Sequence, residues 1–200
     1  MIILIRGGSI AAGFGVEKSY VDLLKEYYAP HGIEIINRSH AKETSFDGAE
    51  NLGKDLDQFQ PNILIIHYAV DDAFHPVMGF DFKENLVQMV RLGKKRLETQ
   101  VLLATSQTFA DPNDMNSMNL YYRFIREVAF SLDCDLIPVH SYWAAYILHR
   151  GLSNSDLTQS DERYPNMQGH KIFAEAFRWK LNRILNGLGY QFDEIEDVPE

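Results

Sequence analysis

The chain opens with the stretch MIILIRGGS, residues 1–9. An apolar run that ends in two glycines predicts a buried strand followed by a tight turn. In α/β proteins, ligands bind at the carboxyl ends of the strands, where the next helix begins and offers backbone N–H groups. We therefore expect the functional site to lie around Ser9.

Short β-type runs alternate with amphipathic stretches along the rest of the chain. Strands are predicted near residues 2–6, 33–37, 62–67, 100–105 and 135–140. Helices are predicted near residues 17–29, 47–59, 82–97, 114–132, 141–150 and 166–186. Helical crossovers between strands produce a parallel sheet that is covered on both faces. The pattern therefore predicts an α/β protein with a five-stranded parallel sheet.

The length and composition predict one domain with one core. The chain has 200 residues, of which 46% are hydrophobic. We expect a single domain over residues 1–190. The net charge is −9, and five acidic side chains fall within residues 193–200. We expect residues 191–200 to form a solvated acidic tail.

The composition also argues against several classes of function. An acidic chain without clusters of Lys and Arg is not expected to bind nucleic acid, because phosphate neutralisation supplies most of the affinity. No stretch approaches the roughly 18 apolar residues of a membrane span. Cys134 is the single cysteine, which excludes a disulfide framework within one chain. Because the first strand begins at residue 1 and leaves no room for a signal peptide, we expect a cytoplasmic protein.

Polar blocks follow the predicted strands and converge on one edge of the sheet. Ser9 ends the first strand, and NRSHAKET (37–44) and HYAVDD (67–72) end the second and third. DERYPNMQGH (161–170) stands just before the last helix. This arrangement, which spans nearly the whole chain, resembles the SGNH/GDSL hydrolase family of lipases, acylhydrolases and esterases.

The resemblance implies a fold and a chemistry. The fold is a flavodoxin-like three-layer α/β/α sandwich with the strand order 2-1-3-4-5. The chemistry is acyl transfer from an ester to water by a serine, on substrates that are often lipids or acetylated sugars. The implied partner is therefore a small ester or carbohydrate ligand, with no cofactor. The oligomeric state does not follow from the resemblance.

The family's catalytic positions are only partly matched. Ser9 matches the nucleophile and Asp161 the carboxylate that orients the base. Tyr164 occupies the position of the catalytic histidine, and Gly8 occupies that of the aspartate before the serine. A phenol with a reference pKa near 10 is a poor base at pH 7, so the family's own route to hydrolysis should be slow.

The positions that bind the oxyanion in the family also differ here. Ser9 keeps its backbone N–H, but Lys42 stands at the glycine position and Asp71 at the asparagine position. A carboxylate there would repel a developing oxyanion by about 4 kcal/mol at roughly 4 Å and an effective dielectric near 20. The two substitutions are complementary in charge, and we expect an ion pair between Lys42 and Asp71. Asp72 keeps the final carboxylate of this block.

Other side chains could complete the site. His40 and His75 lie in the rim loops and are candidates for a replacement base. Arg6 ends an apolar strand, and its burial would cost several kcal/mol unless it is paired. We expect a salt bridge between Arg6 and Asp71 or Asp72, with substrate recognition as the alternative.

Metal and phosphate sites fit the sequence less well. Side chains of metal-binding types occur at His67, Asp71, Asp72 and His75. Their spacing matches no strong signature, and we expect no metal. The glycines at positions 8 and 13 have the spacing of a phosphate-binding loop, but residues 14–15 lack its Lys and its Ser or Thr.

Two functions follow from these observations. The first is an ester hydrolase of the SGNH/GDSL type with weak or non-standard activity, acting on acyl or acetyl esters, including those on a carbohydrate. The second is a family member without hydrolytic activity that binds a carbohydrate, an acyl group or a protein in the same cleft. Serine-dependent turnover separates the two.

Overall fold

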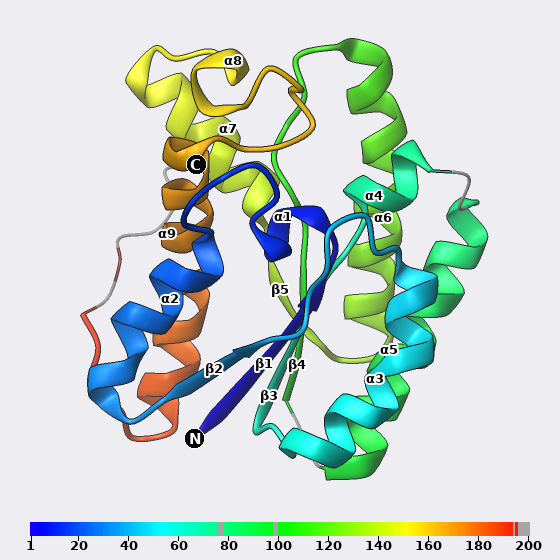
Figure 1. The fold of residues 1–200 in the computed structure, drawn as a ribbon, viewed down its shortest axis with the longest axis vertical. Helices are drawn as coiled ribbons and strands as arrows, with labels where there is room; N and C mark the ends of the chain where they lie inside the picture. The colour runs from blue at the N-terminus through cyan, green and yellow to red at the C-terminus, as the bar shows by residue number, and fades with distance from the viewer. Residues whose placement is uncertain (76–77, 98–99, 194, 196–200) are drawn as a thin grey trace.

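The computed structural model describes residues 1–75, 78–97, 100–193 and 195. Five parallel strands form one sheet in the order β2-β1-β3-β4-β5, which confirms the predicted topology (Figure 1). The strands are β1 (Ile2–Gly7), β2 (Glu34–Asn37), β3 (Ile63–His67), β4 (Gln100–Ala104) and β5 (Asp135–Ile137).

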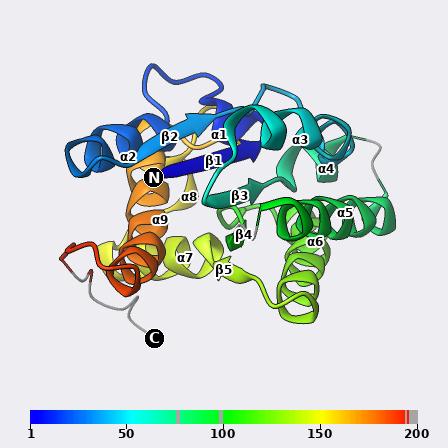
Figure 2. The ribbon, with the colours of Figure 1, turned by 90° about the horizontal axis from the view of Figure 1, so that it is seen from below.

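Helices cover both faces of this sheet, as Figure 2 shows. One layer contains α2 (Tyr20–Tyr28), α7 (Val139–Arg150) and α9 (Met167–Gly187). The other contains α3 (Ser45–Phe59), α5 (Gly79–Leu97) and α6 (Pro112–Ser131). The predicted three-layer α/β/α sandwich is therefore confirmed.

Several short elements complete the chain. They are α1 (Ser9–Ala12), the 3₁₀ turn η1 (Ala29–His31), α4 (Val70–Phe74) and α8 (Asn154–Leu157). None of these was predicted, because a single helical turn is too short to show an apolar periodicity. Two of them, α1 and α4, begin directly after β1 and β3 and place side chains at the carboxyl edge of the sheet.

The pairing of β1 with β3 aligns the two segments that build this edge. Gly7 pairs with His67 in the parallel register, so both strands end at the same level. Both strands are buried on both faces, as expected for the centre of a parallel sheet. The turn at Gly8 and the first turn of α4 therefore stand side by side on a rigid base.

The last strand is shorter than predicted. β5 ends at Ile137, and Pro138 caps the N-terminus of α7. Proline has no N–H to donate to a strand ladder, which accounts for the early end. His140, expected at a strand end, instead lies in the first turn of α7.

The chain stays packed on the fold past the expected boundary at residue 190. The Phe192 side chain is buried, and its ring lies 4.5 Å from that of His31 and 5.2 Å from that of Tyr28. Asp193 accepts a hydrogen bond from the Asn182 side chain through its backbone carbonyl. The other acidic residues of the expected tail lie outside the described residues. Within the described part of the chain, no helix is both long and apolar enough to cross a membrane.

Candidate active site

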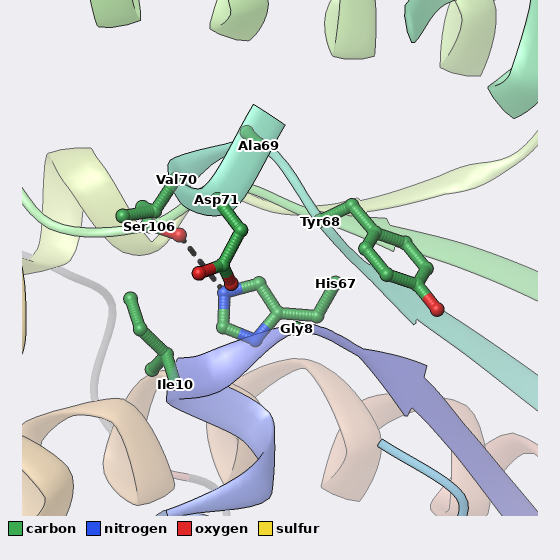
Figure 3. A pocket seen from close by; sticks show the side chains of 8 residues that line it. All are labelled: Gly8, Ile10, His67, Tyr68, Ala69, Val70, Asp71 and Ser106. Carbon is green, nitrogen blue, oxygen red and sulfur yellow. Dashed lines mark hydrogen bonds between the residues drawn. The ribbon is translucent and has the colours of Figure 1, made fainter. Parts of the chain in front are cut away.

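Ser9 lies at the start of α1 and is bonded to a carboxylate from α4. Its hydroxyl donates to Oδ1 of Asp71 at 2.7 Å, and its backbone N–H donates to Oδ2 of the same carboxylate at 2.6 Å. Figure 3 shows the Asp71 side chain directed from α4 toward the end of β1 at Gly8. The structure thus brings together two of the predicted site residues, which are 62 positions apart in the sequence.

Lys42 contributes its backbone to the site. The Lys42 N–H donates to the Ser9 Oγ at 2.8 Å, while the lysine side chain is exposed. Lys42 has a φ of 65°, in the region that favours glycine. The expected ion pair with Asp71 is not formed, since no contact within 4.0 Å joins the two described side chains. The Asp71 carboxylate instead binds the two donors of Ser9.

Gly8 leaves the space that the Asp71 carboxylate occupies. A Cβ atom at this position would lie 2.1 Å from Asp71 Oδ2 and 2.7 Å from the backbone oxygen of Glu43. No side chain fits there while Asp71 remains in place. The absence of the family's aspartate at position 8 is therefore coupled sterically to the presence of Asp71.

Tyr164 approaches the site from the loop before α9. Its backbone N–H donates to the Asp161 carbonyl at 3.0 Å, and its ring lies 5.0 Å from that of Phe14. Burial raises the pKa of the Tyr164 hydroxyl, the Asp71 charge raises it further, and Ser9 opposes this rise. The phenol therefore stays protonated at neutral pH, where it can donate a hydrogen bond but cannot accept the serine proton.

Asp161 does not orient a base in this structure. Its two carboxylate oxygens accept from Nε and Nη2 of Arg163, at 2.8 and 2.7 Å. The bond from Arg163 lowers the pKa of Asp161. The guanidinium of Arg163 also lies 5.2 Å from the centre of the Phe74 ring. The predicted role of Asp161 as an orienting carboxylate is thus replaced by a bidentate pair with Arg163.

The two candidate histidines are engaged elsewhere. The Nδ1 atom of His40 bonds Glu43 at 2.6 Å, and that of His75 bonds the Asp71 carbonyl at 2.8 Å. Neither imidazole forms a hydrogen bond with Ser9 in the structure, which describes all these residues. The base that the family supplies through histidine therefore has no imidazole substitute beside the serine.

His67, at the end of β3, is held in the interior. It bonds the Tyr20 hydroxyl through Nδ1 at 2.8 Å and the Ser106 hydroxyl through Nε2 at 3.0 Å, the latter drawn in Figure 3. Burial lowers the pKa of His67 to about 3, so the ring is neutral at physiological pH. Its bonds tie the sheet to α2 and to the loop after β4.

Burial raises the pKa values of both adjacent carboxyl groups of α4. The pKa of Asp71 is raised by burial, which outweighs the lowering effects of the Ser9 bonds and of the charges of His75 and Arg163. Asp72 is fully buried, and its Oδ1 accepts the Ser45 N–H at 2.8 Å. Burial, with a contribution from Asp71, raises the pKa of Asp72 to about 6.

Arg6 is paired, but not with the expected partners. Its buried guanidinium donates to Glu43 at 2.7 Å and to Asp55 of α3. The prediction of a bond to Asp71 or Asp72 was wrong, because the Arg6 side chain reaches α3 and the loop after β2, whereas the Asp71 carboxylate lies over Gly8.

Glu43, Asp55 and Tyr68 form a hydrogen-bond network with Arg6, and none of the three was predicted from the sequence as a site residue. The Tyr68 hydroxyl donates to Oε1 of Glu43 at 2.6 Å. Asp55 lies on the buried face of α3 in register with apolar residues, and that position is a signal that could have identified it. Because Glu43 follows Lys42 directly, the network also anchors the N–H group that binds Ser9.

A small cavity lies next to the turn that carries Ser9. A cavity of about 10 Å³ adjoins Gly8 and Asp71, and Ser9 itself is fully buried. This volume is about that of one water position. The residues that line it are Gly8, Ile10, His67, Tyr68, Ala69, Val70, Asp71 and Ser106. A substrate would therefore have to displace part of the rim to reach Ser9.

The side chains considered for a metal site do not converge. Over the ranges that the structure describes, no three His, Cys, Asp or Glu side chains are grouped so as to hold a metal ion. His67 faces the interior at Tyr20, whereas the imidazole of His75 turns back on its own helix.

Comparison with known proteins places the chain in a family. The model of the GDSL-like lipase/acylhydrolase family matches residues 6–172. The chain belongs to this family. The match runs from Arg6 into α9, and thus includes the serine turn, the Asp71 segment and the loop with Tyr164.

Relatives of this family include characterised types of esterase. An arylesterase of Vibrio mimicus is 24% identical over 188 residues, which cover 92% of this chain and 89% of the relative. Among solved structures, a mutant of an acetylxylan esterase from Geobacillus stearothermophilus is 19% identical with a TM-score of 0.76, over 95% of this chain and 94% of that one. The esterase EstA from Pseudoalteromonas sp. is 20% identical with a TM-score of 0.75, over 92% and 98%. The structural likenesses confirm the SGNH-type fold.

Proposed function

We propose that this protein hydrolyses carboxylic esters with Ser9 as its nucleophile. The observation that carries the proposal is the hydrogen bonding of Ser9, whose hydroxyl donates to a carboxylate at 2.7 Å and accepts a backbone N–H at 2.8 Å. A serine hydroxyl becomes nucleophilic when an adjacent acceptor can take its proton. Membership of the GDSL-like family, whose relatives include an arylesterase, supports an ester as substrate.

The burial of Ser9 and the acetylxylan esterases among the similar structures favour a small acyl group. Ser9 is fully buried, so even an acetyl ester requires the rim to open before it can reach the hydroxyl. The acetylxylan esterases among the similar structures act on acetyl groups of a carbohydrate, as their names state. We propose an acetyl ester, free or on a carbohydrate, as the substrate class.

The donors for the reaction come from the backbone and from Tyr164. The Lys42 N–H already contacts the reacting oxygen, and Tyr164 retains its proton because burial and Asp71 raise its pKa. In the proposed reaction the Lys42 N–H orients the Ser9 Oγ, and the Tyr164 hydroxyl donates to the negative charge that develops on the carbonyl oxygen of the substrate, as a donor of an oxyanion hole does.

The first test is hydrolysis of p-nitrophenyl acetate by the wild type and by Ser9→Ala. We expect the wild type to exceed the uncatalysed rate and Ser9→Ala to fall to it. Ser141→Ala is the matched control. Ser141 is an exposed serine on α7 whose hydroxyl lies 3.4 Å from an imidazole nitrogen of His140, and it makes no hydrogen bond to Ser9 or Asp71 in the described part of the chain. Equal loss in both variants, or turnover that survives in Ser9→Ala, contradicts the proposal.

A second function is favoured by specific observations at the same site. Tyr164 stands at the position of the base, the Asp161 carboxylate is bonded to Arg163, and Ser9 is fully buried. These features suit a family member that binds an acetylated carbohydrate without turning it over. In that case the wild type and Ser9→Ala hydrolyse the ester at the uncatalysed rate, while an acetylated xylo-oligosaccharide raises the melting temperature of both.

A further inference from the structure

Asp71 can accept the Ser9 proton directly. The Ser9 Oγ accepts the Lys42 N–H, so its own hydrogen is free to point at Asp71 Oδ1 at 2.7 Å. Both oxygens of this carboxylate face Ser9, because Oδ2 accepts the Ser9 backbone N–H. We propose that Asp71 is the general base of the reaction, in place of the family's histidine. This inference rests on the proposed hydrolysis at Ser9.

Backbone geometry holds the base and the nucleophile together. Ala69, at the start of α4, has a φ of 134°, and Lys42 has a φ of 65°, values that residues with a side chain rarely adopt. Ala69 caps the N-terminus of α4, which carries Asp71, and Lys42 supplies the N–H that binds Ser9. Strained backbone of this kind persists where the surrounding structure fixes it, commonly at functional sites.

The other titratable groups around Ser9 cannot take this role in the geometry observed. Tyr164 retains its proton at neutral pH. The imidazoles of His40 and His75 bond Glu43 and the Asp71 carbonyl. Asp161 is held by both nitrogens of the Arg163 fork. Asp71 is thus the acceptor that the described part of the chain presents to the serine hydroxyl.

A base at this position also resolves the repulsion expected between Asp71 and an oxyanion. The carboxylate becomes neutral as it takes the proton, at the same step in which the carbonyl oxygen of the ester becomes negative. The repulsion of about 4 kcal/mol between two unit charges at roughly 4 Å and a dielectric near 20 then does not arise in the transition state. A carboxylate is therefore compatible with the asparagine position when it is itself the proton acceptor.

The reaction balances with this single base. Ser9 Oγ forms a bond to the carbonyl carbon, and its proton passes to Asp71. The tetrahedral intermediate breaks the bond to the alcohol oxygen, which leaves with the proton from Asp71. Water then attacks the acyl-serine, gives a proton to Asp71, and the Ser9 oxygen leaves and takes that proton back. The products are the alcohol and the carboxylic acid.

The pH profile should carry the signature of a carboxylate. The charged or titratable groups that face Asp71 are Tyr164, Arg163, His75 and Asp72. Burial raises the pKa of Asp71 above its ordinary value, so turnover should rise with pH as this carboxyl ionises and then become level. The acid limb should persist in the double variant His40→Gln/His75→Gln.

The deciding experiment is turnover of p-nitrophenyl acetate by Asp71→Asn. Asparagine restores the neutral amide of the family but cannot accept a proton, so we expect turnover to fall by roughly 10²- to 10⁴-fold. Asp22→Asn is the matched control, because Asp22 also accepts the N–H and the hydroxyl of one serine, Ser19, but away from Ser9. A rate in Asp71→Asn that equals or exceeds that of the wild type overturns the inference.

A second variant guards against a loss of folding. Asp71→Ala leaves a space beside Gly8, and formate supplies the missing carboxylate. We expect turnover to rise with formate to a saturating value in Asp71→Ala and to stay at background in Ser9→Ala. If Asp71→Ala hydrolyses the ester without formate, and formate does not change the rate, Asp71 is not the base. If Asp71→Asn is active and Ser9→Ala is inactive, Asp71 is not the base but the proposed hydrolysis stands. If the wild type is inactive, both the proposed hydrolysis and the role of Asp71 are refuted.

Discussion

The pair Ser9–Asp71 and the pair Ser19–Asp22 use the same two serine donors in different surroundings. Ser19 donates its N–H at 3.0 Å and its hydroxyl at 2.7 Å to Asp22, and Ser9 donates the same two groups to Asp71 at 2.6 and 2.7 Å. The first pair spans three residues and closes the capping box of α2. The second spans 62 residues and joins two helices at the sheet edge.

The difference in burial decides what each carboxylate can do. Burial raises the pKa of Asp22, but the bonds from Ser19 and the charge of Lys25 outweigh it, and the pKa is lowered overall. At Asp71 burial prevails and the pKa is raised. The same bonds therefore give a stably ionised helix cap in one place and a carboxylate with a raised proton affinity in the other.

Gly8→Ala offers the strongest way to break the buried pair without touching either member. The added methyl group would lie 2.1 Å from Asp71 Oδ2 and must displace the carboxylate. We expect turnover to fall by about 10²-fold, and the free energy of unfolding to fall by about 1–3 kcal/mol. Assays of p-nitrophenyl acetate turnover and urea unfolding measure the two effects.

Gly13→Ala is the corresponding change at the cap. Its methyl group would lie 2.9 Å from the Ser19 Cβ, and Gly13 has a φ of 77°. This variant should lose stability to a similar extent and keep its turnover. If Gly8→Ala retains full turnover, Asp71 need not hold its observed position for catalysis.

Ser19→Ala tests the capping pair in the opposite sense. Loss of the capping hydroxyl should lower the free energy of unfolding by roughly 1–2 kcal/mol, since the N–H of Asp22 loses its acceptor. Turnover should match that of the wild type. A large loss of turnover with little change in urea midpoint would show that the cap contributes to the site and would remove the contrast between the pairs.

Asp72→Asn tests the effect of burial on the pKa of the carboxyl group next to Asp71. Burial raises the pKa of Asp72 to about 6, above its ordinary value of 3.8, so the folded protein binds this proton more tightly than the unfolded chain. Stability from this group is therefore gained as the pH falls through about 6 and lost as it rises again. Between pH 7 and 5 the wild type should gain about 1 kcal/mol relative to Asp72→Asn, measured by urea unfolding. Parallel pH dependences in the two proteins would contradict the raised pKa.

The fold was predictable because its signals are local and repeated. Alternating β-type runs and amphipathic stretches, read together with the family resemblance, gave the five strands and their order. The exceptions have physical reasons. Pro138 ends β5 early, and α1, α4 and α8 are single turns without a measurable period.

The positions of the candidate site residues were predictable from the sequence, but their bonds were not. Ser9, Lys42, Asp71 and Tyr164 were all expected near the sheet edge, and the structure brings Ser9, Lys42 and Asp71 into contact. The expected attraction between Lys42 and Asp71 was wrong because the lysine acts through its backbone. Such a contact depends on a φ of 65°, which the identity of the residue does not reveal. The partners of Arg6 were missed for a related reason, since strand direction alone does not fix which loop covers a side chain.

The close approach at Gly8 makes the residues tolerated at positions 8 and 71 depend on each other. Aspartate is the family residue at position 8, and it cannot coexist with the observed placement of Asp71. An acidic side chain can therefore occupy position 8 or the observed place of Asp71, but not both. Restoring aspartate at position 8 requires that the carboxylate at position 71 leave its observed place. The two sites should change together when descendants of this protein are compared.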